Sequence, residues 1–101
     1  MKKNYDSYFT RVYNLTSSRS GRPVANQYEI ITKDNYIFQS YNSIIAKVNR
    51  KTNQITLDDF YWDYSVTTFK YLRQFLDISL SKDEIKRNID IGVYKTANLN
   101  I

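Results

Sequence analysis

Three closely spaced aspartates are the residues of this chain whose types and spacing could support catalysis. Asp58, Asp59 and Asp63 lie within a window of six residues. Two or three carboxylates at a sheet edge could hold Mg²⁺ and support a metal-dependent nuclease. Such nucleases usually add a lysine on the strand beside the acid, and no matching Asp…Glu-x-Lys arrangement occurs here. The favoured interpretation is therefore structural: Asp58 and Asp59 end a strand, and Asp63 caps a helix.

The chain contains no cysteine and no histidine, which excludes several kinds of catalytic and metal site. Disulfides, thiolate nucleophiles, sulfur-based zinc sites and histidine-based triads are impossible. An oxygen-only Mg²⁺ or Ca²⁺ site stays open. We expect a protein that is not an enzyme and that has no cofactor.

Aromatic and basic residues in the middle of the chain invite comparison with single-stranded nucleic-acid binders. In those proteins, rings on a sheet stack on bases beside basic side chains. Two observations argue against the comparison: the RNA-binding signature of glycine beside aromatics is absent, and the strands precede the helices. The rings are Tyr28, Tyr36, Phe38 and Tyr41, and the nearby basic residues are Lys33, Lys47, Arg50 and Lys51.

The net charge of +5 is unevenly distributed along the chain. Residues 1–25 hold five basic residues and one acidic residue, whereas residues 26–101 hold ten basic and nine acidic residues. This distribution favours a phosphate, an RNA or an acidic protein surface near the N-terminal segment. Ordinary solubility charge on a flexible end is the alternative. The loop SRSGRP (18–23) lacks the Gly-Lys-Ser/Thr ending of a phosphate-binding loop, although its arginines could clamp a phosphate or an acidic partner.

Residues 5–15 and residues 92–101 are each compatible with two different structures. Aromatic spacing in YDSYFTRVYNL suits one face of a short helix, with a strand as the competitor. The tail GVYKTANLNI could be a further strand or a frayed end. Residues 14–26 contain the only proline and read as a loop.

Four strands separated by short polar breaks are expected between these segments. The breaks are too short for a crossover helix, so neighbouring strands should pair antiparallel as a meander. The doublets Ile30–Ile31 and Ile44–Ile45 point apolar groups to both faces, so we expect both faces to be at least partly covered. The expected strands are 27–32, 36–41, 43–49 and 54–60.

After residue 60, the spacing of the apolar residues changes from the two-residue period of a strand to the three- or four-residue period of a helix, and two helices are expected. Apolar residues recur every three or four positions over 65–77, where Asp63 or Ser65 can cap the first turn. Lys70 and Arg73 occupy the opposite face of this helix. Ser81 and Glu84 form a capping box that starts a second helix, which should stop around 90–92.

The aromatic-rich stretch FYWDYSVTTFKYL (60–72) joins the last strand to the first helix. Phe60 and Trp62 share one phase of the incoming strand, and Tyr61 and Asp63 share the other. Trp62 should therefore pack at the strand-to-helix corner. The rings that stay candidates for exposed contacts are Tyr61, Tyr64 and Tyr71.

About half of the chain resembles a group of small uncharacterised proteins encoded by phages and plasmids of low-GC Gram-positive bacteria. The shared strand pattern maps onto Ser40, Tyr41, Ser43, Ile45 and Ala46. The shared helix-start pattern, Trp-x-Tyr-Ser-x-Thr-Thr followed by Phe-Leu, maps onto Trp62, Tyr64, Ser65, Thr67, Thr68, Phe75 and Leu76. Small proteins of this origin commonly bind host machinery, and anti-CRISPR proteins are one outcome.

These observations predict an α+β protein: an antiparallel sheet of about four strands, covered on one face by two helices. Residues 1–25 form a basic arm or short helix, and residues 26–101 form the α+β domain. The leading functional prediction is a cytoplasmic, non-enzymatic inhibitor of a bacterial host defence system, with an RNA-guided CRISPR nuclease as the expected target. A basic chain excludes DNA mimicry, so inhibition would proceed by occluding or locking the effector. The alternative is a small nucleic-acid-binding module of a mobile element.

We expect the partner to be a protein, with an RNA or DNA phosphate backbone as a further possibility and no membrane contact. The chain could be a monomer or a homodimer. No apolar run reaches the roughly 20 residues that a membrane span requires. The expected partner-binding residues are Tyr8, Arg11, Tyr13, Arg19, Arg22, Tyr61, Tyr64, Lys70, Tyr71 and Arg73.

Overall fold

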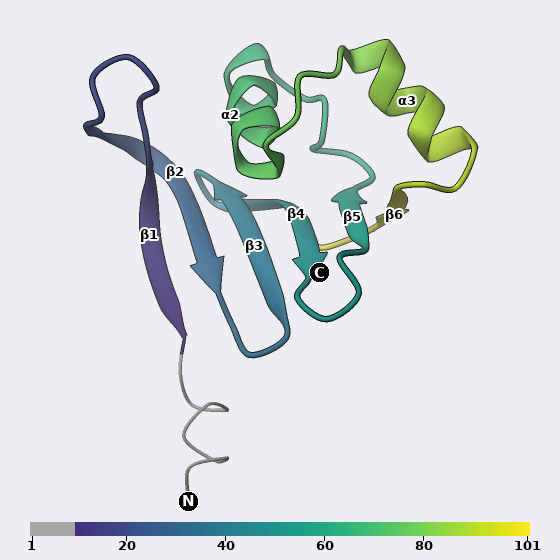
Figure 1. Ribbon diagram of the computed structural model, residues 1–101, viewed down its shortest axis with the longest axis horizontal. Helices are drawn as coiled ribbons and strands as arrows, with labels where there is room; N and C mark the ends of the chain where they lie inside the picture. The colour runs from purple at the N-terminus through teal and green to yellow at the C-terminus, as the bar shows by residue number, and fades with distance from the viewer. Residues whose placement is uncertain (1–9) are drawn as a thin grey trace, which may run out of the picture.

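The computed structural model describes residues 10–101, and its framework is one mixed sheet of six strands (Figure 1). The strands lie side by side in chain order, and each of the first five pairs antiparallel with the next. The sixth pairs parallel with the fifth, because the chain passes through two helices before it returns to the sheet. The strands are β1 (Arg11–Thr16), β2 (Pro23–Ile31), β3 (Asn35–Ser40), β4 (Ser43–Asn49), β5 (Ile55–Asp58) and β6 (Lys95–Ala97).

Two helices, α2 (Val66–Leu76) and α3 (Lys82–Asp90), lie between β5 and β6 and start at serine caps. The Ser65 hydroxyl accepts a hydrogen bond from a first-turn backbone N–H of α2 at 3.0 Å. At α3 the Ser81 hydroxyl accepts from the Glu84 N–H, and the Glu84 carboxylate accepts from the Ser81 N–H at 2.8 Å. These bonds satisfy backbone groups that have no partner inside a helix. Hydrogen bonds from Ser81 also lower the pKa of Glu84.

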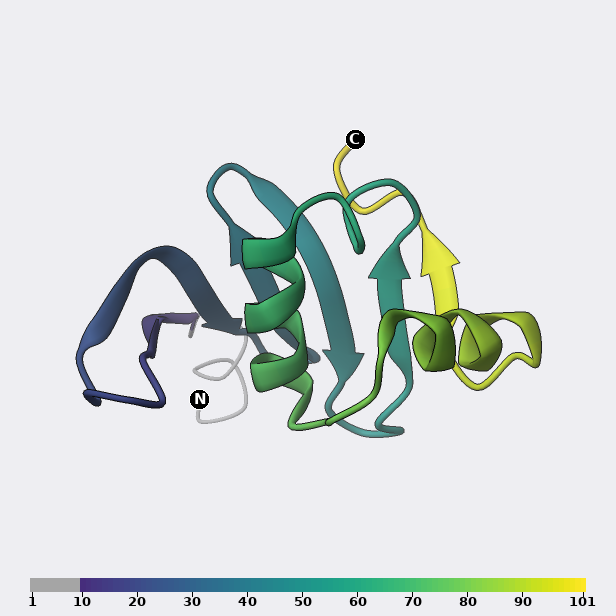
Figure 2. The ribbon, with the colours of Figure 1, turned by 90° about the horizontal axis from the view of Figure 1, so that it is seen from above.

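Both helices lie on the same side of the sheet, and the core fills the space between the two layers (Figure 2). Phe38 of β3 is fully buried and stacks on Phe75 of α2, with 5.6 Å between the ring centroids. The Ser40 and Thr68 hydroxyls form a buried hydrogen bond of 3.0 Å between β3 and α2. The buried hydrophobic residues are Leu15, Phe38, Ile45, Ala46, Leu57, Trp62, Leu72, Ile85 and Tyr94.

The α+β class and the two helices on one face are confirmed. The four expected strands correspond to β2–β5, and the sheet gains a strand at each edge, β1 and β6. Helix α2 is one residue shorter at each end than the expected range of 65–77. Helix α3 starts directly after the Ser81 cap and ends at Asp90, where the sequence predicted its end. The agreement follows from the local nature of capping signals. Within residues 10–101, no helix combines the length and the apolarity that crossing a lipid bilayer requires.

The described part of the N-terminal segment, from residue 10 onward, contains a strand. Residues 11–16 form β1, the edge strand, and Tyr8 lies outside the described residues. The expected boundary at residue 25 falls inside β2, so the described part of the basic segment is built into the sheet rather than set apart from it. β1 and β2 together form a ribbon whose turn, residues 17–22, carries Arg19 and Arg22 at its tip.

The strand-to-helix corner follows the sequence prediction only in part. Trp62 is buried, as expected, and its ring contacts Phe69 edge-to-face at 6.2 Å between centroids. Strand β5 ends at Asp58, however, so the two-residue alternation does not continue to Phe60. Phe60 is 60% exposed, because residues 59–64 form turns in which side-chain direction no longer alternates.

Candidate functional site

The sheet face opposite the helices holds the candidate site. Successive side chains of a strand point to opposite faces. Because Phe38, Ala46 and Leu57 are paired neighbours buried under the helices, the side chains of Ile37, Lys47 and Thr56 next to them point the other way. We call this side, on which neither α2 nor α3 lies, the open face. One row of paired residues crosses all six strands on it: Val12, Ile30, Ile37, Lys47, Thr56 and Lys95.

We expected both faces to be at least partly covered, and within the described residues the two faces differ in how much of them is covered. Within the described residues, both helices pack on the other side of the sheet. Ile30, Ile37 and Ile44 are only partly buried on the open face, and Val12 is 59% exposed. The doublet Ile44–Ile45 lies at a β-bulge, where strand alternation is interrupted.

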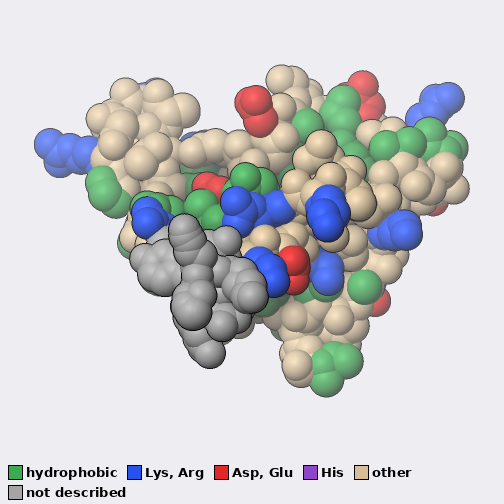
Figure 3. All heavy atoms as spheres, turned by 60° about the horizontal axis from the view of Figure 1, so that its bottom comes forward, with side chains coloured by type: hydrophobic (Ala, Val, Ile, Leu, Met, Phe, Trp, Pro, Cys, Tyr) green, Lys and Arg blue, Asp and Glu red, His purple; other side chains and the backbone are tan. Residues whose placement is uncertain are grey.

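A shallow hollow of about 1180 Å³ lies over the open face where the β2–β3 and β4–β5 turns meet. We call it the basic hollow. Its lining combines five cationic side chains with one carboxylate, Asp34, and no other acidic residue. Figure 3 shows Lys and Arg side chains gathered at this end of the molecule. The cationic residues are Lys33, Lys47, Arg50, Lys51 and Lys95.

Arg50 ties together the two turns that frame the basic hollow. Its backbone N–H donates to the carbonyl of Asp34 at 2.8 Å, and its guanidinium donates to the carbonyl of Thr32 at 2.7 Å. The same guanidinium lies 5.2 Å from the centroid of the Tyr36 ring, within cation–π range. These contacts hold the β2–β3 turn against the β4–β5 turn, so the positions of Lys33 and Lys51 are set relative to each other.

The β4–β5 turn is also held internally. The Asn49 side-chain oxygen accepts hydrogen bonds from the N–H groups of Lys51 and Thr52 at 2.9 and 3.0 Å. Asn53 adopts a left-handed conformation with φ of 63°, which asparagine tolerates better than most residues, and its N–H donates to the carbonyl of Asn49 at 2.8 Å. The turn therefore presents Lys51 from a fixed backbone.

Lys47, Thr56 and Lys95 form the floor of the basic hollow. They are paired neighbours on β4, β5 and β6. Adjacent strands lie about 4.8 Å apart, so the two lysine backbones are roughly 10 Å apart with a hydroxyl between them. Two cations at this spacing, with a neutral hydrogen-bonding group between them, suit an anion that carries more than one phosphate.

The four aromatic residues predicted to line a base-stacking sheet do not share one face. Only Tyr28 lies on the open face, because its partner Gln39 precedes Ser40, whose side chain points to the helices. Phe38 is buried under α2. Tyr36 has the same orientation as Phe38, and Tyr41 lies in the β3–β4 turn. The four basic residues named beside these rings, in contrast, all line the basic hollow.

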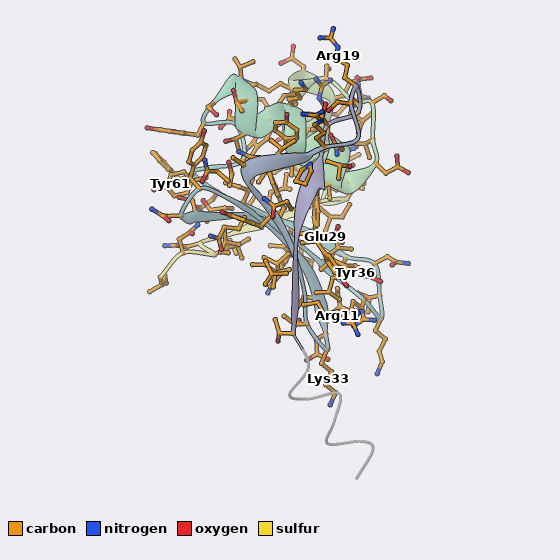
Figure 4. The ribbon with its side chains drawn as sticks, turned by 90° about the vertical axis from the view of Figure 1, so that its left-hand side faces the viewer. Arg11, Arg19, Glu29, Lys33, Tyr36 and Tyr61 are labelled. Carbon is orange, nitrogen blue, oxygen red and sulfur yellow. The ribbon has the colours of Figure 1, made fainter. Side chains whose placement is uncertain are left out.

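The predicted partner-binding residues fall into separate groups. Arg11, Tyr13, Arg19 and Arg22 are exposed on the β1–β2 ribbon, and the Arg11 guanidinium donates to the Tyr13 hydroxyl at 3.2 Å. Figure 4 shows Arg19 at one end of this ribbon and Arg11 near the other, so these residues make no single cluster.

A second group surrounds the corner between β5 and α2. Tyr61 and Tyr64 contact each other and Phe60, with ring centroids 4.8 to 5.6 Å apart. We call these three rings the aromatic corner. Phe60 and Tyr64 are exposed, whereas Tyr61 is half-buried.

The remaining three predicted residues belong to α2. Lys70 extends over the Tyr71 ring at 5.3 Å, and Tyr71 is partly buried against the core. The Arg73 guanidinium lies 4.9 Å from the Phe69 ring centroid, and its Nε is buried. Tyr71 and Arg73 therefore take part in packing within the chain.

Lys95 is the residue of the basic hollow that sequence reasoning missed. It lies in a tail for which a strand and a frayed end were both open. Its position depends on β6 pairing in parallel with β5, a contact between segments nearly 40 residues apart along the chain. A local sequence pattern does not specify a pairing of this kind.

The candidate nuclease carboxylates have structural roles or stand apart. Asp58 is buried and accepts four hydrogen bonds, from the N–H groups of Phe60, Tyr61 and Leu99 and from the Asn100 amide, at 2.8 to 3.1 Å. Burial raises the pKa of Asp58, but these hydrogen bonds outweigh it and leave the pKa below its ordinary value. The cap of α2 is Ser65 and not Asp63, and Asp59 is exposed. Among the described residues, no three acidic side chains gather into a group that could hold a metal ion.

Comparison with models of protein families gives a match. A model of a family of unknown function, DUF8033, matches residues 7–91. The match spans most of the chain and includes β1 to β5 and both helices, so the chain belongs to this family. Comparisons with curated proteins and with solved structures find no match.

Proposed function

For this member of a family of unknown function, we propose a non-enzymatic nucleic-acid-binding module that holds the phosphate backbone in the basic hollow. The observation that carries the proposal is the convergence of five cationic side chains and one carboxylate on one hollow. A phosphate backbone gains affinity by releasing condensed counterions to such a cluster, so several adjacent cations are worth more than the same cations scattered over a surface. We place this activity in the bacterial cytoplasm.

The four lysine charges of the basic hollow are available for a ligand. Lys33, Lys47, Lys51 and Lys95 make no ion pair within residues 10–101, so binding an anion breaks none there. The hollow is also too open and too polar to enclose a small apolar ligand. Its shape suits an extended polyanion that passes across it.

The test is fluorescence anisotropy with a labelled single-stranded oligonucleotide of about 12 nucleotides. This length lies within the range of about 4 to 16 nucleotides that a single-strand-binding domain occupies. The test variant is the double substitution Lys47→Gln and Lys95→Gln. Single-strand binding releases about 0.7 counterions per phosphate contact, so the slope of log affinity against log salt should become shallower by about 1.4. The matched control is Arg19→Gln with Arg22→Gln, which removes the same charge at the ribbon tip and should change the slope less.

Two results would overturn the proposal. One is the absence of binding to any oligonucleotide at low salt. The other is an equal loss of affinity in the two double variants, which would mean that only the overall charge matters and not the hollow.

Inhibition of a host defence system is the second candidate function, and the aromatic corner is the observation that favours it. Phe60 and Tyr64 are 60% and 67% exposed in a cluster of three rings. Exposed tyrosine and phenylalanine side chains are enriched at protein interfaces, where they supply much of the binding energy. Such a protein would bind an RNA-guided nuclease through this corner and occlude or lock it.

A pull-down from host lysate tests this second candidate. The wild-type chain should enrich a defence protein, and the Phe60→Ala and Tyr64→Ala double variant should not. Phage or plasmid survival under interference should rise with the wild-type chain alone. The candidate fails if no defence protein is enriched and survival does not change.

A further inference from the structure

The open face is divided into an apolar half and a basic half. Along the row that crosses the sheet, the strands β1 to β3 contribute Val12, Ile30 and Ile37, and the strands β4 to β6 contribute Lys47, Thr56 and Lys95. Ile37 and Lys47 are paired directly, so the two halves meet between β3 and β4.

A second row extends the apolar half. It runs through Asn14, Tyr28, Gln39 and Ile44, which pair in that order across β1 to β4. Tyr28 is the aromatic residue of this row, and it lies next to Ile30 along the same side of β2. The apolar side chains of this half are therefore Val12, Tyr28, Ile30, Ile37 and Ile44, and the polar residues Asn14 and Gln39 flank Tyr28 in the second row.

From this division we infer that the ligand is a single-stranded nucleic acid. Its phosphates lie in the basic hollow, and its bases rest on the apolar half with one base stacked on Tyr28. The inference rests on the proposed function and adds the class of nucleic acid. DNA and RNA share the chemistry on which it depends.

Charge complementarity selects this occupant over a duplex. An unpaired strand carries phosphates along one side and exposed base faces along the other, which matches a surface that is basic on one half and apolar on the other. A duplex turns phosphates outward and keeps its bases stacked inside. A sheet face that binds a duplex backbone would set the side chains of Ile30 and Ile37 against phosphates and solvent, with no apolar partner.

The spacing across the sheet also fits a single strand. Ile37 and Lys47 lie on adjacent strands about 4.8 Å apart, so a nucleotide with its phosphate over β4 or β5 can reach β2 and β3 with its base. Successive nucleotides can then follow the strand direction from the turns toward Tyr28.

The experiment compares four probes by fluorescence anisotropy or by competition: oligo-dT, oligo-U, a duplex of the same length, and inorganic polyphosphate. The chain should bind the single strands at least about tenfold more tightly than the duplex, because only unpaired bases can stack. Polyphosphate should compete weakly, since it occupies the basic hollow and leaves the apolar half empty.

Variants on the apolar half separate stacking from charge. Tyr28→Ala should weaken single-strand binding by roughly 5- to 100-fold and leave the salt slope unchanged, because it removes a ring and no cation. Tyr28→Phe keeps the ring and should bind like the wild type. Ile37→Thr keeps a β-branched side chain in β3 and gives a second readout if Tyr28→Ala does not fold. Val66→Ser, at an apolar side chain of α2 that is 89% exposed, is the control away from the open face.

Each outcome decides a different claim. Equal affinity for single strand and duplex overturns the single-strand inference, and so does wild-type affinity in folded Tyr28→Ala and Ile37→Thr variants. Both outcomes leave phosphate binding in the basic hollow intact. No binding to any of the four probes overturns the proposed function itself. A preference between oligo-dT and oligo-U, with the duplex still weaker, supports the inference and shows which of the two single strands binds more tightly.

Discussion

The two faces of the sheet are built from the same strands and differ in what lies against them. On the covered face, Phe38, Ala46 and Leu57 are fully buried under the helices. On the open face, their neighbours Ile37, Lys47 and Thr56 are only partly buried. A strand with one apolar side chain on each face would ordinarily need two covering layers. The difference indicates that the stability of the described domain comes mainly from the covered face.

Truncation of one side chain on each face should give the largest contrast. Leu57→Ala removes a fully buried side chain and should lower the free energy of unfolding by about 2–5 kcal/mol. Ile37→Ala removes a half-buried one and should cost roughly half as much or less, because part of its surface is already in water. Urea unfolding followed by circular dichroism measures both. Equal losses would contradict the assignment of the two faces.

Asp58 is the exception on the open-face side of β5, because it is buried and fully hydrogen-bonded. Asp58→Asn places an amide group where the carboxylate accepts four hydrogen bonds, so it should lower the free energy of unfolding by about 1–3 kcal/mol. The neighbouring Asp59→Asn removes the same charge from an exposed side chain and should change stability by less than about 0.5 kcal/mol. A similar loss in both variants would mean that net charge, rather than hydrogen bonding, is responsible.

The stability gained from Asp58 should depend on pH in a defined direction. Its pKa is lowered in the folded state, so its contribution is complete above the ordinary value of 3.8 and is lost as the pH falls through the lower folded pKa. The difference between wild type and Asp58→Asn should therefore be constant near neutral pH and shrink below about pH 4. Glu84 has a lowered pKa too, but it is present in both proteins and cancels. A difference that grows on acidification would contradict this assignment.

The cap of α2 should have a smaller effect, since it concerns one hydrogen bond at the end of one helix. Ser65→Ala removes the acceptor for the first-turn N–H and should cost about 1 kcal/mol. Ser79→Ala, at an exposed serine between the two helices, is the matched control and should be nearly neutral. Thermal unfolding of both variants distinguishes a cap from a general effect of losing a hydroxyl.

The smallest effect on stability is expected from the residues proposed to bind the ligand. Lys47→Gln with Lys95→Gln should change the free energy of unfolding by no more than about 0.5 kcal/mol, because Lys95 is exposed, Lys47 is only partly buried, and the two substitutions remove like charges from one surface. Calorimetry measures this in the same preparations that are used for the salt series. A large loss of stability would mean that the two lysines support the fold, and the binding data would need other variants.

The sequence is a good guide where structure depends on near neighbours. The limits of α2 and α3 follow from Ser65 and from the Ser81–Glu84 capping box, because a cap and the helix it starts are within a few residues of each other. The four strands of the meander follow from short apolar runs and short breaks. Trp62 was expected at a buried corner, where it lies.

The sequence is a poor guide where structure depends on distant segments. The net charge of residues 26–101 is close to zero, so the sequence favours the N-terminal segment as the place where a phosphate or an acidic partner binds. Eight of the nine acidic residues of that span lie outside the basic hollow, whereas five of its ten basic residues line it. Net charge along a chain does not show this, because convergence depends on strand register and turn position.

By itself, the sequence determined the α+β class, the ends of both helices and the exclusion of cysteine and histidine chemistry, because composition and local periodicity carry that information. Only the tertiary structure decided that β6 pairs in parallel with β5, that Lys95 joins Lys47 across Thr56, and that Tyr28 alone among the predicted rings shares the open face. The physical reason is the same in each case. A strand fixes which side chains alternate, but only its partners fix which of the two faces is covered and which charges become neighbours.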